Sequence, residues 1–132
     1  MSHLKNKSEI LKDAARLLDA KGFYPAVAHC AYYSCYQLLI HIWLHSMGKS
    51  ETDLVLKRTT YNAGSHETLI NEVWEHIKRK NKSDARTFNE NIFQLKRLRL
   101  SADYADASFG YTQSRKSMEL SASITPILKN YC

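Results

Sequence analysis

The chain has 132 residues, of which 44% are hydrophobic and 24% are charged, with a formal net charge of +6. This balance excludes an intrinsically disordered chain and predicts one folded domain over residues 1–132, with its core within about residues 8–128. The basic charge suits an anionic partner such as RNA, and only four glycines and two prolines favour long helices over short strands.

The first helix is expected to run from Ser8, as its N-cap, to Gly22. Its apolar residues share one face of the helix: Ile10, Leu11, Ala14, Leu17 and Leu18. The preceding segment is charged and lacks the apolar stretch of a secretory signal, so we expect a cytoplasmic location.

The second helix lies within residues 24–48, a stretch without Asp, Glu, Lys or Arg. The stretch is long enough to cross a bilayer, but it carries three His, four Tyr, one Gln and two Ser, which would make its insertion unfavourable. We therefore predict a central helix buried among its neighbours and no membrane association.

The rest of the chain predicts three further helices. Residues 49–65 lack clear periodicity and are expected to form the longest connection. A third helix begins near Ser65 as its cap, a fourth covers about residues 85–104, and a last one carries an apolar repeat of Leu120, Ile124, Ile127, Leu128 and Tyr131. With no competing strand pattern, the expected fold is all-α, an antiparallel bundle of about five helices.

The fourth helix places a charge within an apolar stripe. At 100° per residue, Phe88, Ile92, Leu95 and Arg99 lie on one side. A guanidinium in this position requires a partner, because an unpaired buried charge is very costly. Asp103 is four residues further along the same face, so we predict an Arg99–Asp103 ion pair.

The opposite side of this helix is also partly apolar. It carries Phe93, Arg97, Leu100 and Tyr104 at helical spacing. A helix with two apolar faces in a small bundle favours a second subunit on one of them. We therefore predict a homodimer formed through this face.

Two motifs in the chain resemble those of the HEPN superfamily of small helical bundles. The segment "FYPAVAHCAYYSCYQLL" resembles the family's G-x-Y-x-x-A-x-x-x-A-Y-Y helix through residues that include Gly22, Tyr24, Tyr32 and Tyr33, with approximate spacing. The segment "LKRLRLSADYAD" contains the family's complete R-x-x-A-D-Y element at residues 99–104, and "SHETLI" at 65–70 resembles a His-bearing helix start. The resemblance covers about residues 8–128 and implies a HEPN-like fold.

Many HEPN proteins are metal-independent endoribonucleases whose Arg and His, spaced as R-x(4–6)-H, meet at a dimer cleft. The resemblance implies that Arg97 occupies the Arg position and Tyr104 the position of a Tyr that, in a toxin subgroup, a partner nucleotidyltransferase modifies. Ala102 stands where the catalytic His is expected, and no Arg in the chain has a His five to seven residues after it.

Two functional hypotheses follow. In the first, the protein is a dimeric, non-hydrolytic module that binds RNA, a nucleotide or a nucleotidyltransferase partner, in a toxin–antitoxin or defence system. In the second, it is a metal-independent endoribonuclease with a rearranged active site. The candidate catalytic residues of this site are Arg97, Arg99, Asp103, Tyr104 and, near a helix N-terminus that lowers its pKa, His66.

The remaining patterns favour structural interpretations. His41 and His45 have the i, i+4 spacing of a metal pair but no third ligand nearby, so we expect neither a metal nor a cofactor. The three cysteines are expected to be free thiols. The turn "KRKNKSDAR" carries five cations, but no aromatic residue is interleaved with them, so the expected role is a solvated turn rather than base stacking.

Overall fold

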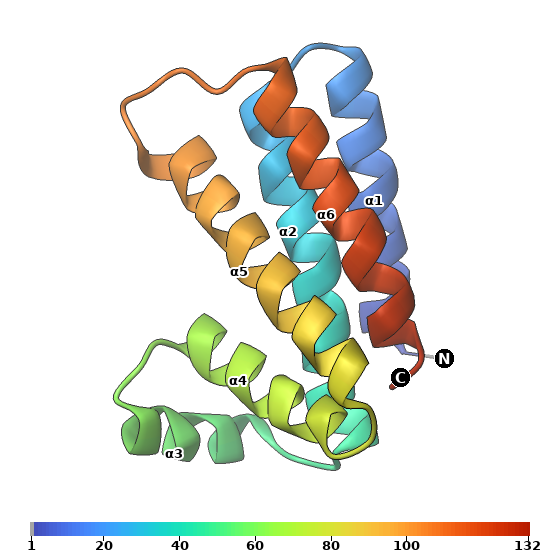
Figure 1. Ribbon diagram of the computed structural model, residues 1–132, viewed down its shortest axis with the longest axis vertical. Helices are drawn as coiled ribbons and strands as arrows, with labels where there is room; N and C mark the ends of the chain where they lie inside the picture. The colour runs from blue at the N-terminus through green and yellow to red at the C-terminus, as the bar shows by residue number, and fades with distance from the viewer. Residues whose placement is uncertain (1) are drawn as a thin grey trace.

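The computed structural model describes residues 2–132, and every regular element in this range is a helix (Figure 1). The six α-helices are α1 (His3–Ala20), α2 (Tyr24–His41), α3 (Glu51–Tyr61), α4 (Ser65–Lys78), α5 (Lys82–Tyr104) and α6 (Tyr111–Lys129). A π-helical turn, η1 (Ile42–Ser46), extends α2. The predicted all-α fold is confirmed, although residues 2–132 form six helices rather than about five.

Helix α2 is the centre of the arrangement. Helices α1, α5 and α6 all pack against it, and α5 also packs against α6 (Figure 1). Helix α4 packs mainly on α5, and α3 packs on α4 at the lower end of the molecule in Figure 1. This order places the start of α4 beside the middle of α2, where the candidate site is found.

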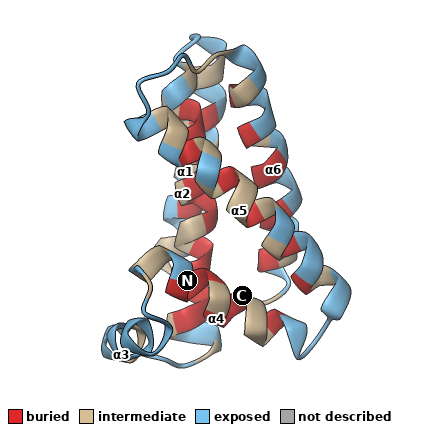
Figure 2. Cartoon of the chain, turned by 60° about the vertical axis from the view of Figure 1, so that its left-hand side comes forward, coloured by how far each residue is buried: buried red, intermediate tan, exposed pale blue. Residues whose placement is uncertain are grey.

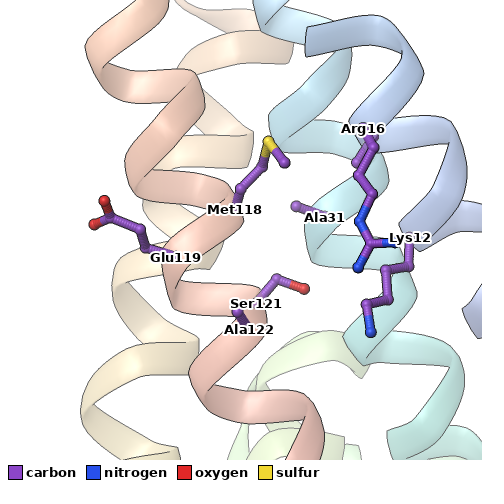
Figure 3. Close-up of a pocket in the computed structure, with 8 residues that line it drawn as sticks. Lys12, Arg16, Ala31, Met118, Glu119, Ser121 and Ala122 are labelled. Carbon is purple, nitrogen blue, oxygen red and sulfur yellow. The ribbon is translucent and has the colours of Figure 1, made fainter. Parts of the chain in front are cut away.

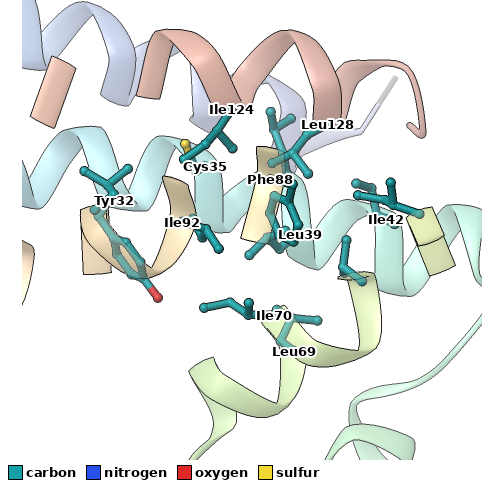
Figure 4. Packing of buried hydrophobic residues seen from close by; sticks show 14 of the residues in the cluster. Tyr32, Cys35, Leu39, Ile42, Leu69, Ile70, Phe88, Ile92, Ile124 and Leu128 are labelled. Carbon is teal, nitrogen blue, oxygen red and sulfur yellow. The ribbon is translucent and has the colours of Figure 1, made fainter. Parts of the chain in front are cut away.

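The hydrophobic core is formed by α2 with its extension η1 and by α4, α5 and α6. Figure 4 shows its buried side chains: Tyr32, Cys35, Leu39, Ile42, Leu69, Ile70, Phe88, Ile92, Ile124 and Leu128. The prediction of a central helix within residues 24–48, buried among its neighbours, is therefore confirmed. Within residues 2–132, no helix combines the length and apolar character that a membrane span requires.

Helix α1 begins earlier than expected. Its N-cap is Ser2, whose hydroxyl accepts a hydrogen bond from the Leu4 amide at 3.1 Å. Ser8, the expected cap, lies inside the helix and is buried at its contact with α2, where its hydroxyl donates to the Ser34 carbonyl oxygen at 2.6 Å. A serine can cap a helix or pack at a close contact between two helices, and Ser8 packs at the contact between α1 and α2.

The expected apolar face of α1 is also partly wrong. Ile10 and Leu17 are 58% and 67% exposed, because the contact with α2 is centred on the small residues Ser8 and Ala15. A small residue at the crossing lets two helices approach closely and turns the larger apolar side chains outward.

A set of hydroxyl groups links α1, α2 and α6 inside the bundle. The Ser34 hydroxyl donates to the Ala31 carbonyl oxygen at 2.7 Å and lies 3.2 Å from the Ser121 hydroxyl. The Ser121 hydroxyl is also 3.6 Å from the Cys35 sulfur. Together with the Ser8–Ser34 bond, these contacts satisfy polar groups that would otherwise be costly inside a core.

The expectation of an irregular connection over residues 49–65 is wrong, because most of it forms α3. Ser50 and Asp53 make a capping box, in which each side chain bonds the other residue's backbone N–H at 3.1 and 2.8 Å. Asn62 ends the helix in the left-handed conformation, with φ of 52°. Helix α3 has no buried residue, so it lacks the apolar repeat that reveals a helix in a sequence (Figure 2).

Two further helix starts differ from expectation. Helix α4 does begin at Ser65, but its N-cap is Gly64, without a side-chain hydrogen bond. Helix α5 begins at Lys82, three residues before Ala85, because the Asn81 side chain accepts a hydrogen bond from the Asp84 amide at 3.0 Å.

Candidate functional site

Arg99 lies in the last turns of α5 and points into the bundle. Phe88, Ile92 and Leu95 on the same stripe are fully buried, and Arg99 itself is only 6% exposed. Its NH1 atom is 3.7 Å from Oδ2 of Asp103, so the predicted ion pair is confirmed.

Three tyrosine rings surround the guanidinium of Arg99. Its central carbon is 5.0 Å from the ring centroid of Tyr32, 5.4 Å from that of Tyr33 and 5.9 Å from that of Tyr104. Such contacts stabilise a cation through the negative face of each ring. The Nε atom of Arg99 nevertheless has no hydrogen-bond partner among the described residues. A buried donor is therefore left over, which is costly unless a ligand accepts from it.

His29 on α2 belongs to the same site and was missed by sequence reasoning. Its Nδ1 atom lies 2.8 Å from Oδ2 of Asp103, the oxygen that also faces Arg99. The His29 side chain is 49% exposed, and that of Asp103 is 20% exposed. When Nδ1 donates to the carboxylate, the other ring nitrogen, Nε2, is left as an acceptor. No spacing rule indicates this pair, because 74 positions separate the two residues.

His66 reaches the site from the first turn of α4. Its Nδ1 atom is 2.9 Å from the Tyr32 hydroxyl, and its ring stacks on Tyr36 with centroids 4.2 Å apart. Burial, followed by the positive charges of Arg99 and Lys96, lowers the pKa of His66 to about 4. The predicted direction is correct, but burial rather than the helix N-terminus is the largest cause.

We call these residues the Arg99 cluster: His29, Tyr32, Tyr33, Tyr36, His66, Arg99, Asp103 and Tyr104. Of the five candidate catalytic residues, the structure brings together Arg99, Asp103, Tyr104 and His66. Arg97 is exposed on another side of α5, and no hydrogen bond or ion pair among residues 2–132 joins it to the cluster. Tyr104 is 76% exposed and forms the outer edge of the cluster.

The cluster combines two chemically different imidazoles. At neutral pH the ring of His66 is neutral, since its pKa is about 4, so His66 can accept or donate a hydrogen bond but supplies no imidazolium. His29 is held by a carboxylate and open to solvent, which is the arrangement of a general base. Burial also raises the pKa of Tyr32, so its phenol stays protonated.

The other candidate residues lie outside the cluster. The rings of His41 and His45 stand 5.0 Å apart, and among residues 2–132 no group of three or more metal-ligating side chains is present. Cys30, Cys35 and Cys132 are free thiols, as expected.

A separate cavity of about 260 Å³ lies between α1, α2 and α6 (Figure 3). Lys12 and Arg16 line it from α1, and Met118 faces them from α6, whereas Glu119 points away. No residue of the Arg99 cluster lines this cavity.

No protein-family model, curated protein or solved structure matches the chain. The resemblance to HEPN proteins therefore depends on the residues of the motifs alone.

Proposed function

We propose that the protein is a dimeric, HEPN-like module that binds RNA or a nucleotide at the Arg99 cluster. The observation that carries this proposal is the Arg99 guanidinium, which is held 3.7 Å from Asp103 and lies against the ring of the exposed Tyr104. The planar guanidinium suits a phosphate group, whose oxygens accept charge-assisted hydrogen bonds from such donors.

The aromatic residues supply the second part of the recognition. Tyr104 is largely exposed beside Arg99, and Tyr33 is half-buried between Arg99 and the rings of His29 and His66. Exposed rings next to a cation allow a base to stack while its phosphate meets the charge. The net charge of +6 supports the approach of a polyanion.

Replacement of Tyr104 tests this proposal without disturbing the core. We expect Tyr104→Ala to weaken the binding of a labelled single-stranded oligoribonucleotide about tenfold, measured by fluorescence anisotropy, because one stacking contact is lost. Tyr111→Ala is the matched control, since Tyr111 is also exposed and also lies against an arginine, Arg115, at 5.2 Å. Equal affinities of the two variants would contradict binding at the cluster.

The resemblance extends the proposal to a toxin–antitoxin or defence system with a nucleotidyltransferase partner. The exposed phenol of Tyr104 supports this, because a modifying enzyme can reach it. We expect a nucleotidyltransferase gene beside the gene for this protein, and a nucleotidyl adduct on Tyr104 by mass spectrometry after the two proteins are incubated with nucleotide. An unmodified Tyr104 would remove this part of the proposal.

The His29–Asp103 pair favours a second candidate function, a metal-independent endoribonuclease with a rearranged active site. Ala102 leaves α5 without the imidazole of the family motif, and His29 presents one from α2. In this reaction Nε2 of His29 takes the proton of the ribose 2′-hydroxyl, and the 2′-oxygen attacks phosphorus. The bond to the 5′-oxygen breaks and water protonates the leaving oxygen, so the products carry a 2′,3′-cyclic phosphate and a 5′-hydroxyl.

Chemical rescue separates catalysis by His29 from a structural role. We expect His29→Ala to abolish cleavage while RNA affinity is retained, and added imidazole to restore part of the rate. His45→Ala controls for contaminating nuclease, because His45 is exposed and distant from the cluster in sequence and fold. Binding without cleavage by the unaltered protein would leave only the first candidate function.

A further inference from the structure

A second basic site lies at the other end of α5. An open cleft of about 290 Å³ lies between the end of α4 and the start of α5. It is lined by Trp74 and Lys78 of α4 and by Lys82, Arg86 and Glu90 of α5, among others. The sequence pattern places no aromatic residue among these cations. The structure corrects this, because Trp74 lies one helical turn before Lys78 and its ring faces the same cleft.

The indole of Trp74 is only partly buried, and one of its faces is covered by a cation. The Nζ atom of Lys78 is 4.6 Å from the ring centroid. For a partly exposed ring, stacking of a nucleic-acid base is the stronger of these two interactions. A base that stacks on Trp74 would therefore displace the ammonium group and free it to pair with a phosphate.

The charges around the cleft define the ligand further. Lys78, Lys82 and Arg86 contribute three positive charges and Glu90 one negative charge, while Arg79 and Lys80 add two exposed cations in the adjoining turn. Several cations in a row beside one aromatic ring match a chain of phosphates with unpaired bases, rather than a single small anion. We infer that this cleft, which we call the Trp74 cleft, binds a single-stranded segment of RNA.

The Trp74 cleft is distinct from the Arg99 cluster. Arg86 and Arg99 are thirteen positions apart on α5, which is about 20 Å along a helix. Arg86, Asn89 and Glu90 continue the stripe of Phe93 towards the start of α5, so the cleft lies beyond the N-terminal end of the proposed dimer face. The inference therefore goes beyond the proposed function, and each site can fail without the other.

Intrinsic fluorescence tests the cleft directly, because Trp74 is one of only two tryptophans and the other, Trp43, is 2% exposed in the core. We expect titration with a decamer of riboadenylate to quench the emission saturably in the unaltered protein. We expect Trp74→Phe to show no quenching and to bind the labelled decamer several-fold more weakly. The decamer of deoxyadenylate distinguishes RNA from single-stranded DNA, and heparin, which has charges but no bases, is expected to cause no such quenching.

Charge removal provides the independent measurement. We expect Lys82→Gln with Arg86→Gln to lower RNA affinity about tenfold or more, and to reduce the dependence of log affinity on log salt by about 1.4, the effect of two phosphate contacts on a single strand. Lys7→Gln with Lys116→Gln removes the same charge from exposed positions on α1 and α6 and is the matched control.

The outcomes separate the two sites. Quenching together with a selective effect of the Lys82/Arg86 variant supports the Trp74 cleft, even if Tyr104→Ala has no effect and the cluster proposal fails. RNA binding without quenching, equal effects of the two double variants, equal binding of DNA, or no RNA binding at all overturns the inference. If RNA still binds and Tyr104→Ala weakens it, the Arg99 cluster stands alone.

Discussion

Asp103 contacts two side chains through a single carboxylate oxygen, which lies 2.8 Å from Nδ1 of His29 and 3.7 Å from NH1 of Arg99. The two members of the Arg99–Asp103 pair differ in burial, because the Arg99 side chain is 7% exposed and that of Asp103 is 20% exposed. Loss of the Asp103 carboxylate leaves the buried charge of Arg99 without an ionic partner. Loss of the Arg99 guanidinium leaves a carboxylate that still contacts water and His29. Asp103 is therefore expected to contribute more to the stability of the fold than Arg99.

This inequality predicts an order of stabilities. We expect Asp103→Ala to lower the free energy of unfolding by about 3 kcal/mol, and Arg99→Met, which keeps the volume but removes the charge, by about 1 kcal/mol. Urea denaturation of the two variants measures the difference. If Arg99→Met proves the more damaging change, the tyrosine rings rather than Asp103 are the main partners of the guanidinium.

His66 gives the fold a dependence on pH. Its pKa is about 4 in the folded protein and near 6.5 when the chain is unfolded, so the unfolded state binds the proton more readily between these values. The stability that the neutral imidazole contributes is thus fully present above about pH 6.5 and is lost progressively as the pH falls towards 4.

Replacing the imidazole of His66 should make the thermal stability of the protein depend less on pH. We expect the midpoint of thermal unfolding to fall between pH 7 and pH 4.5 more steeply in the unaltered protein than in His66→Gln. Burial also lowers the pKa of His41 and of His76, so some dependence remains in the variant. His45→Gln serves as the control, and a profile of His66→Gln parallel to that of the unaltered protein would refute the assignment.

At the scale of single elements, α2 and α3 are the two extremes of the fold. Helix α2 buries residues on several of its sides, and most of them are apolar. Helix α3 has no buried residue and is stabilised by its caps and by contacts with α4. A helix with so few buried contacts opens locally at low cost in free energy.

The capping box of α3 offers a test of this difference. We expect Ser50→Ala to destabilise α3 by about 1 kcal/mol and to speed the exchange of its backbone amide hydrogens roughly fivefold. Exchange in α2 should be unchanged, since α3 opens without it. Hydrogen–deuterium exchange read by mass spectrometry measures both helices, and equal acceleration in α2 would show that the two open together.

The helices that the sequence predicted well are those whose apolar residues face the core. Leu120, Ile124 and Leu128 repeat at helical spacing because α6 packs its length against α2 and α5. Helix α3 was missed for the opposite reason, although Ser50 and Asp53 have the spacing of a capping box. The spacing of a capping box covers only four residues, so by itself it is weak evidence for a helix when no apolar repeat follows it.

The candidate site was predictable only where its contacts are local. The Arg99–Asp103 pair spans one helical turn and follows from a helical wheel. His29 joins the site through packing of α2 against α5, and no pattern within either segment predicts that contact. The placement of His66 against Tyr32 likewise depends on the angle at which α4 crosses α2.

At the scale of the whole molecule, the exposed side of α5 is the proposed homodimer face. Leu100 and Tyr104 are 39% and 76% exposed there, and Arg97, one turn before Leu100 in the same stripe, is also exposed. An interface at this position would bring two Arg99 clusters close to each other and cover Phe93 and Leu100, with Tyr104 at the rim of the interface.

Sedimentation equilibrium at micromolar concentration tests the assembly. We expect a dimer for the unaltered protein and a monomer for Leu100→Asp, because a carboxylate would be buried in the interface without a partner. Leu17→Asp is the matched control, since Leu17 is an exposed leucine on α1 and its replacement should leave the dimer intact. A monomeric unaltered protein would remove the predicted face.

The hydroxyl contacts of Ser8, Ser34 and Ser121 bear on how α1, α2 and α6 are aligned along their axes. Two leucines remain in contact when one helix slides by an ångström or two, but a hydrogen bond of 2.6 Å does not survive such a shift. The hydrogen bonds of these serines therefore fix the positions of the three helices relative to one another along their axes. The position of Tyr32 and Tyr33 relative to α5 then depends on these serines. The serines lie on the side of α2 that faces α1 and α6 and do not contact Arg99, although they help to position the rings around it.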